Sequence, residues 1–350
     1  MTLRGTRLGA IVGTLLAVVA TACSGGGPSG PPPVELLHVS YDATRELFEE
    51  VNPRFAAQWA RDHGGQTVQV RMSHGGSGRQ ARSVVDGLEA DVVSLGLAFD
   101  VDALARERQL LAASWAERLP NASAPWTSTV VFVVRRGNPK GLRDWPDLVR
   151  GDVQVITANP KTSGGARWAY LAAYGFATRH GHAGRRGDEA GTEFVRALFQ
   201  RVPVLDSGAR GSSTTFTRNR LGDVLLTWEN EARLLLAANP DDGLEIVMPS
   251  ESILAEPPVS VVDHSVERHQ TRQAAEAYAR FLWTPEVQEI AARRFFRPRD
   301  PEVLARHAAD FPVLTVFTLA ETFGSWDDVH RTHFADGALF DRLQRQREAE

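Results

Sequence analysis

Cysteine is nearly absent from this chain, because Cys23 is the only one among 350 residues. A single thiol cannot form a disulfide within the chain, so no disulfide framework is expected. Lysine is scarce as well, since Lys140 and Lys161 are the only two. Arginine therefore carries nearly all of the positive charge, which we attribute to the base composition of the genome and not to function.

An excess of charge of either sign is also lacking. The formal net charge is -4, and the pI is near 6.2. A basic surface for nucleic acid is therefore not expected. Hydrophobic residues make up 43% of the chain and charged residues 23%, as in globular proteins that bury a sizeable core. At 350 residues the chain has the length of two ordinary domains.

The one prominent apolar run lies at the N-terminus and is short. Arg4 and Arg7 precede the apolar residues 8–20, which are too few for a comfortable membrane span. This pattern indicates a secretory signal. Small residues lead up to Cys23, as in bacterial lipoprotein signals, although Ala20 stands where Leu is usual.

A tether follows the signal. Residues 24–33 are only Gly, Ser and Pro, a composition typical of a flexible-to-extended linker. We therefore expect a signal peptide over 1–23 with Cys23 as the lipidation site, and a flexible tether over 24–34. The folded protein is then expected outside the cell, lipid-anchored to the outer face of the cell membrane.

Strand and helix patterns alternate along the rest of the chain. Apolar, β-branched runs predict strands at 36–40, 68–72, 91–95, 130–134, 153–157, 202–205, 224–227, 246–249 and 259–262. Helical patterns separate most of these runs and continue from residue 271 to the end. Such alternation predicts an α/β fold with mainly parallel sheets.

Two lobes facing one another across a cleft are the simplest arrangement of these elements. A polar break at 123–129 separates them, with lobe I expected from residues 35–122 and 263–350 and lobe II from 123–262. Within lobe I, Asn52 and Pro53 are expected to end one helix and restart it. Within lobe II, residues 180–191 are rich in His, Gly and Arg and predict a surface loop.

Four polar loops follow predicted strands, at 41–44, 73–78, 162–165 and 206–211, and Trp228 ends a fifth strand. Ligands of open α/β sheets bind at the carboxyl ends of strands. What the loops share is uncharged donors: backbone N–H groups, hydroxyls and an indole N–H. A desolvated cleft of such donors suits a fully ionised oxyanion.

The stretch 159–168 shows this chemistry most clearly. Ser163 is placed as a helix N-cap, and Gly164 and Gly165 fall in the first turn. Unpaired N–H groups and the helix dipole favour an anion there, and glycine lets it approach closely. Taken alone, the pattern also fits an ordinary capped helix, and Trp228 alone also fits a core tryptophan.

Signatures of catalysis are missing. Ser73 and His74 are adjacent at a strand end, so their side chains point in different directions. Ser77 lacks the glycine two residues later that a nucleophile elbow requires, because Arg79 stands there. The glycine loops lack the Gly-Lys-Ser/Thr ending of a P-loop, and the histidines of 180–191 have no further ligand cluster. We therefore expect no enzyme activity, no metal and no cofactor.

Several ordered segments resemble the sulfate/thiosulfate-binding proteins of bacterial ABC transporters. They are 40–47, 73–80, 159–168, 206–211, 228–232, 249–257 and 296–299. The resemblance covers nearly all of residues 35–345. It implies a two-lobed, hinged solute-binding protein of the periplasmic type (type II) that closes on dehydrated sulfate and delivers it to a membrane permease. It also implies a monomer that binds no nucleic acid.

The resemblance also implies which residues bind sulfate. Backbone N–H groups are assigned to Asp42 and Ala209, and a hydroxyl to Ser77. The remaining donors are the start of the helix at Ser163, Gly164 and Gly165 and the indole of Trp228; His74, Arg167 and Arg210 support the loops from behind. Departures at Ala43, Thr162 and 212–213 leave these donors in place. The alternatives are thiosulfate, phosphate, molybdate or tungstate as ligand, or a hydrolase of oxyanion esters.

Overall fold

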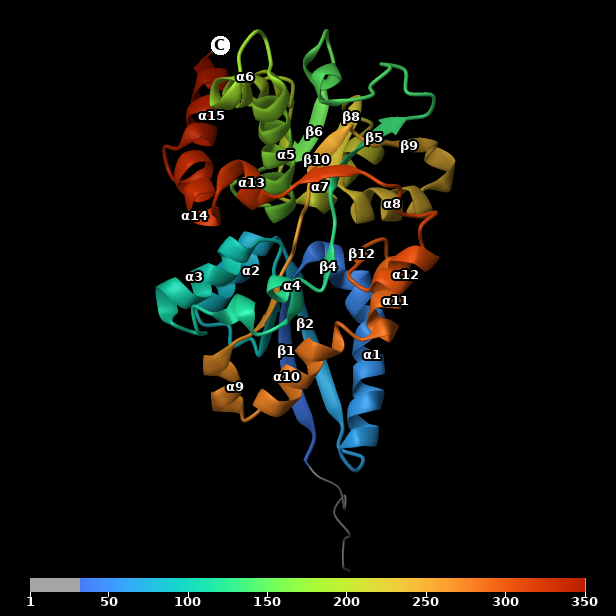
Figure 1. Ribbon diagram of the computed structural model, residues 1–350, viewed down its shortest axis with the longest axis vertical. Coiled ribbons are helices and arrows are strands. Elements are labelled where there is room, and N and C mark those ends of the chain that lie inside the picture. Colours follow the sequence, from blue (N-terminus) through green and yellow to red (C-terminus); the bar gives the residue numbers. More distant parts are fainter. Residues whose placement is uncertain (1–31, 350) are drawn as a thin grey trace, which may run out of the picture.

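The computed structural model describes residues 32–349, so the expected signal peptide, Cys23 and the tether up to residue 31 lie outside the described residues. Two α/β lobes lie one above the other along the long axis of the molecule (Figure 1). Each is built on its own sheet. The predicted two-lobed α/β fold is therefore confirmed.

Lobe I holds a four-stranded sheet in the order β11-β3-β1-β2. The strands are β1 (Val34–Tyr41), β2 (Val68–Gly75), β3 (Val92–Ser94) and β11 (Val259–Val261). β1 runs parallel to β2 and β3, and β11 runs antiparallel to β3. The helices are α1 (Arg45–Asp62), α2 (Ser77–Val85), α3 (Ala98–Arg108), α4 (Pro120–Ser123), α9 (Asp263–His269), α10 (Arg272–Phe281), α11 (Pro285–Arg293) and α12 (Pro301–Arg306). Short 3-10 helices span Asp42–Thr44 (η1) and Trp115–Glu117 (η2).

Lobe II holds a five-stranded sheet in the order β7-β6-β8-β5-β9. The strands are β5 (Val130–Arg135), β6 (Val155–Ala158), β7 (Leu205–Asp206), β8 (Val224–Trp228) and β9 (Leu244–Val247). The helices are α5 (Gly164–His180), α6 (Gly187–Phe199), α7 (Ala209–Thr217) and α8 (Glu229–Ala238), with 3-10 turns at Trp145–Val149 (η3) and Pro240–Asp242 (η4). β6 is parallel to β7 and β8, but β5 is antiparallel to β8 and β9. Strands β6, β7, β8 and β9 thus share one direction, and β5, which enters from the hinge, is the reversed strand of this sheet. The expectation of mainly parallel sheets holds in this lobe apart from β5.

Three segments cross between the lobes and form the hinge. The first runs through β4 (Trp126–Thr127) to Ser128, inside the polar break at 123–129. The second passes through Ala255, which forms an antiparallel bridge with Ser128. The third follows β12 (Arg297–Pro298) and ends in β13 (Thr315–Phe317). β12 pairs with β4, and β13 pairs with β10 (Glu251–Ile253). The crossings are thus bonded to one another in pairs.

The C-terminal helices depart from the expected division. α13 (Leu319–Phe323), α14 (Trp326–Val329), a π-helical turn at His330–Phe334 (η5) and α15 (Leu339–Ala349) lie beside α5 and α6 (Figure 1). Tyr170 and Phe334 lie 5.1 Å apart between ring centroids, and Phe199 and Phe340 lie 5.2 Å apart. The assignment of all of 263–350 to lobe I is therefore wrong for 319–349. A run of helices carries no local signal of which lobe it joins.

Two local predictions also change. α1 runs without interruption through Pro53. The missing N–H of Pro53 would have bonded the carbonyl of Glu49, and Glu49 is exposed, so water can satisfy it. The expected loop at 180–191 shrinks to 181–186, because α5 extends to His180 and α6 begins at Gly187.

Candidate functional site

Three helix starts converge where the two lobes meet. α2 begins at Ser77 in lobe I, and α5 and α7 begin at Gly164 and Ala209 in lobe II. A Cβ added at Gly164 would lie 3.1 Å from the Cβ of Ser77, so α2 and α5 touch across the lobe boundary. First-turn N–H groups lack partners within their own helix. Such N–H groups and the helix dipole favour a negative charge at a helix start.

The indole of Trp228 adds a further donor. Trp228 is the last residue of β8, and its side chain is 4% exposed. Its Nε1 is buried and has no hydrogen-bond partner within the described residues. A Cβ at Gly165 would lie 3.1 Å from this Nε1, so the indole N–H lies directly beside the α5 start. A buried donor without an acceptor costs about 1–3 kcal/mol, which indicates that a ligand supplies the acceptor.

Ser163 is the N-cap of α5, as its sequence context predicts. Its Oγ accepts a hydrogen bond from the Ala166 N–H at 3.3 Å, and the residue is buried. This bond uses a lone pair of the oxygen and leaves the hydroxyl hydrogen to donate. Ser163, Gly164 and Gly165 thus present donors from one turn of backbone.

The hydroxyl of Ser77 is engaged elsewhere. Ser77 Oγ donates to Asp100 Oδ2 at 2.5 Å and accepts from the Gly96 N–H at 2.8 Å. The hydroxyl hydrogen is therefore already engaged, which leaves the backbone N–H of Ser77, at the first position of α2, as the donor that this residue can offer. Asp100 carried no sequence signal for this role, because its contact with Ser77 exists only in the fold.

Asp42 opens the 3-10 turn that follows β1. Its Oδ1 accepts from Arg45 Nη2 at 3.2 Å, so an arginine already holds its carboxylate. Its backbone N–H remains the group that the resemblance implies. His74 lies near the end of β2, where it pairs in register with Ser40. Burial and the nearby Arg45 guanidinium lower the pKa of His74, which favours its neutral form.

Arg167 supports the 159–168 loop from behind. Its Nε donates to the Pro160 carbonyl at 2.8 Å. Its Nη1 lies 3.9 Å from Asp100 Oδ1, so the same guanidinium reaches lobe I. Burial lowers the pKa of Arg167, which the Asp100 carboxylate partly offsets. Trp168 adds a second link across the boundary, since its Nε1 donates to the Gly96 carbonyl at 2.8 Å.

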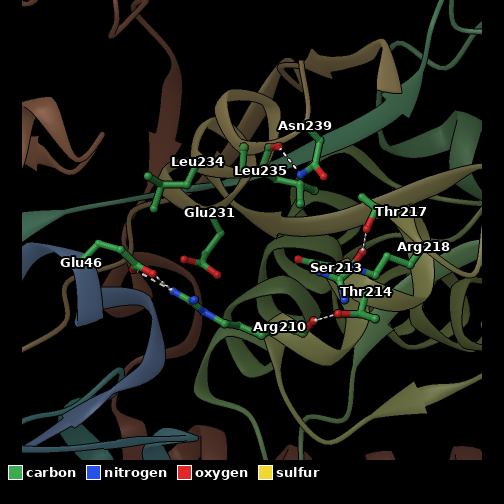
Figure 2. Close-up of a pocket in the computed structure, with 11 residues that line it drawn as sticks. Glu46, Arg210, Ser213, Thr214, Thr217, Arg218, Glu231, Leu234, Leu235 and Asn239 are labelled. Carbon is green, nitrogen blue, oxygen red and sulfur yellow. Dashed lines mark hydrogen bonds and ion pairs between the residues drawn. The ribbon is translucent and has the colours of Figure 1, made fainter. Parts of the chain in front are cut away.

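Arg210 spans the lobes on the other side of the site. Its Nη2 lies 2.8 Å from Glu46 Oε2 on α1, and the pair is half exposed. Figure 2 shows this pair at the edge of a cavity of about 420 Å³ between α7 and α8. Glu231 faces the same pair from α8. Burial raises the pKa of Glu231 to about 7. The start of α7 lines this cavity through Arg210, whereas Ser77, Gly164 and Trp228 are not part of its lining.

Other kinds of site find no support among residues 32–349. That part of the chain holds no group of three or more His, Cys, Asp or Glu side chains placed to bind a metal ion. None of its helices has the length and apolar character needed to cross a membrane. Hydrogen-bond donors around the helix starts remain the main chemical feature.

Comparison with known proteins agrees with this geometry. A family model described as bacterial extracellular solute-binding protein matches residues 36–297. The sulfate-binding protein of Escherichia coli (strain K12) is 55% identical over 316 residues, covering 89% of this chain and 94% of that protein. The thiosulfate-binding protein of Pseudomonas aeruginosa is 50% identical over 329 residues, covering 94% of this chain and 96% of that protein.

A solved structure extends the likeness to the fold. The sulfate-binding protein SubI from Mycobacterium tuberculosis H37Rv is 33% identical, with a TM-score of 0.76, and covers 86% of this chain and 100% of that chain. These relatives confirm the resemblance to sulfate- and thiosulfate-binding proteins that the sequence motifs predict. The chain belongs to the family of bacterial extracellular solute-binding proteins.

Proposed function

We propose that this protein is an extracytoplasmic sulfate receptor that delivers its ligand to the permease of an ABC importer. The observation that carries the proposal is the indole N–H of Trp228, which is buried beside the start of α5 and has no hydrogen-bond partner among residues 32–349. The names of its relatives support the choice of sulfate.

The proposed ligand cage consists of donors from both lobes. They are the backbone N–H groups of Asp42, Ser77, Gly164, Gly165 and Ala209, the hydroxyl of Ser163 and the indole of Trp228. Sulfate carries no proton near neutral pH and accepts at all four oxygens. Several charge-assisted hydrogen bonds then offset its lost hydration without a cation in contact.

Capture without catalysis is part of the proposal. The hydroxyl of Ser77 donates to the buried carboxylate of Asp100. It also accepts a hydrogen bond from the Gly96 N–H, and this second bond reduces the nucleophilicity of the hydroxyl oxygen. The cage needs no cofactor, because its donors are groups of the chain itself. Thiosulfate is the second candidate ligand, since a relative at 50% identity carries that name. Its terminal sulfur is a weaker acceptor than oxygen.

Calorimetric titration of the folded domain with sulfate, thiosulfate, phosphate and molybdate tests the proposal. Phosphate keeps at least one proton near neutral pH, and that proton finds no acceptor in a cage of donors. An unmatched donor costs about 1–3 kcal/mol, so sulfate should bind about 5–150-fold more tightly than phosphate. Equal affinities for the two anions would contradict the donor-only cage.

We further propose that the receptor is a monomer held at the outer face of the cell membrane by a lipid on Cys23. The support is the sequence pattern before Cys23 and the Gly, Ser and Pro tether after it. In membrane fractionation, Cys23→Ala should release the protein or leave an unprocessed precursor. Retention at the membrane with the signal removed would rule out this anchor.

A further inference from the structure

A buried ion pair connects the hinge to the residue that follows Trp228. Arg297 donates to both carboxylate oxygens of Glu229, from Nε to Oε2 at 2.6 Å and from Nη2 to Oε1 at 3.1 Å. The Glu229 side chain is 0% exposed and that of Arg297 is 17% exposed. Glu229 begins α8 in lobe II, whereas Arg297 lies on β12 beside the first crossing segment. The pair therefore spans the hinge.

Further bonds tie the same part of α8 to the crossing segments. The Glu229 N–H donates to the Thr129 carbonyl at 2.9 Å. Ser128 Oγ donates to Asn230 Oδ1 at 3.0 Å. On the third crossing, the Pro312 carbonyl accepts from Arg297 Nη2 at 3.0 Å. The start of α8 is thus bonded to the first crossing directly and to the third crossing through Arg297.

The neighbouring Trp228 pairs with Val130 of β5, the strand into which the first crossing leads. It is the N-cap residue of α8, but no side-chain hydrogen bond caps the helix there. Its ring lies 5.5 Å from that of Tyr41, between centroids, on the lobe I side. The backbone that carries the indole is therefore held on one side by the pairing with β5 and on the other by the bonds of Glu229. A fully desolvated carboxylate requires its partner, and a two-pronged arginine contact fixes its orientation.

We infer that Arg297 is a positioning residue for ligand binding, which acts through Glu229 to hold the Trp228 indole against the anion site. This inference rests on the proposed function. It assigns a ligand-related role to a hinge residue that does not itself reach the cage. Arg297 and Glu229 make the position of the indole depend on the hinge.

Arg233 provides a matched control. It is the second arginine on Glu229, with Nη2 3.2 Å from Oε1, and its side chain is 20% exposed, close to the value for Arg297. It lies one turn along α8 and so belongs to the same helix as Glu229. Its guanidinium also lies 5.9 Å from the centroid of the Phe295 ring, near β12. Substituting Arg233 therefore perturbs the same carboxylate but leaves the ion pair between Arg297 and Glu229 in place.

A double-mutant cycle tests the inference. Sulfate affinity is measured for the wild type, R297K, W228F and the double variant, and for R233K alone. Lysine keeps the charge but loses the two-pronged geometry, so folding should survive; the melting temperature without sulfate checks this. R297K should weaken binding by about tenfold, and in the W228F background its effect should fall below about twofold. R233K should change affinity by less than about twofold.

Two outcomes would overturn the inference: R297K and W228F acting additively, or R233K weakening binding as much as R297K. The indole NMR resonance of Trp228 provides a readout without ligand, and it should shift in R297K but not in R233K. An unshifted resonance in a folded R297K would also count against positioning. If the wild type binds no sulfate, the proposed function fails, whereas the resonance still reports whether Arg297 holds the indole.

Discussion

At the scale of single residues, Trp228 offers a clean test of the ligand cage. Its buried N–H has no partner in the described residues. The hydrogen bond that it can donate should therefore contribute to the free energy only when a ligand binds. Trp228→Phe removes this donor and little volume. Loss of one hydrogen bond to a charged acceptor costs about 1.5–3 kcal/mol, so sulfate affinity should fall about 10–150-fold.

Trp283→Phe is the matched control for this change, because the Trp283 indole donates to Asn121 Oδ1 at 3.2 Å on an exposed surface. Its sulfate affinity should equal that of the wild type. Unliganded Trp228→Phe should melt within a few degrees of the wild type. Unchanged affinity in Trp228→Phe would exclude the indole from the site.

The serines of the site show how far residue patterns predict contacts. Ser163 was predictable as an N-cap because a cap depends on the next three residues, and the bond to Ala166 confirms it. The hydroxyl of Ser77 was not, because its partner Asp100 lies 23 residues further along the chain. Sequence shows which groups can donate, whereas the fold decides which of them are already engaged.

At the scale of elements, the close approach of the α2 and α5 starts predicts a steric block. A Cβ on Gly164 would lie 3.1 Å from Ser77 Cβ and 3.4 Å from Leu97 Cγ, both in lobe I. Gly164→Ala should therefore hold the lobes slightly apart. Overpacking of this kind costs about 1–3 kcal/mol, so sulfate affinity should fall about 5–150-fold in calorimetry.

Gly208→Ala is the control for that block, because no atom lies within 4 Å of the added Cβ beside the α7 start. Small-angle scattering with saturating sulfate should show less compaction for Gly164→Ala than for Gly208→Ala. Equal compaction and affinity would mean that the lobe boundary tolerates the methyl group.

Most elements were predictable because their signals are local. Eight of the nine expected strands overlap an observed strand by two residues or more, since short apolar, β-branched runs need only a neighbouring strand to become buried. The strand expected at 202–205 shares only Leu205 with β7. The antiparallel direction of β5 was not predictable, because direction depends on where the hinge delivers the chain. The continuation of α1 through Pro53 was not predictable either, because a helix tolerates proline only when the freed carbonyl can face water.

At the scale of the whole molecule, contacts outside the cage also join the lobes. Arg106 on α3 pairs with Asp327 on α14 at 3.0 Å. Phe99 and His330 stack with their ring centroids 4.4 Å apart. α14 belongs to the C-terminal helices that were expected in lobe I, and its packing on lobe II is what makes these contacts cross the boundary. No local pattern encodes such an arrangement.

Buried histidines of the folded molecule predict how its stability changes with pH. Burial lowers the pKa of His333 to about 4 and, together with nearby His74, that of His38 to about 3. In the unfolded chain both titrate near 6.5. Below about pH 6.5 the unfolded state therefore binds protons that the folded state does not. Each histidine then removes up to about 1.4 kcal/mol of stability per pH unit.

His269 has the opposite sign. Its hydrogen bond to Asp91 raises its pKa, with Glu89 contributing further. Its contribution is therefore fully present below about pH 6.5 and is lost as the pH rises through the folded-state pKa. Between pH 7.5 and 5.5, His269 opposes the loss of stability caused by His333.

Urea unfolding in sulfate-free buffer at pH 7.5, 6.5 and 5.5 separates the two effects. Ligand must be absent because it stabilises the folded state by mass action. His333→Gln should make the decline in unfolding free energy below pH 6.5 shallower than in the wild type. His269→Gln should make the decline from pH 7.5 to 5.5 steeper, because the opposing contribution is gone. If His333→Gln kept the wild-type slope, His333 would already be protonated or exposed in the folded protein, contrary to its burial among Tyr170 and its aromatic neighbours.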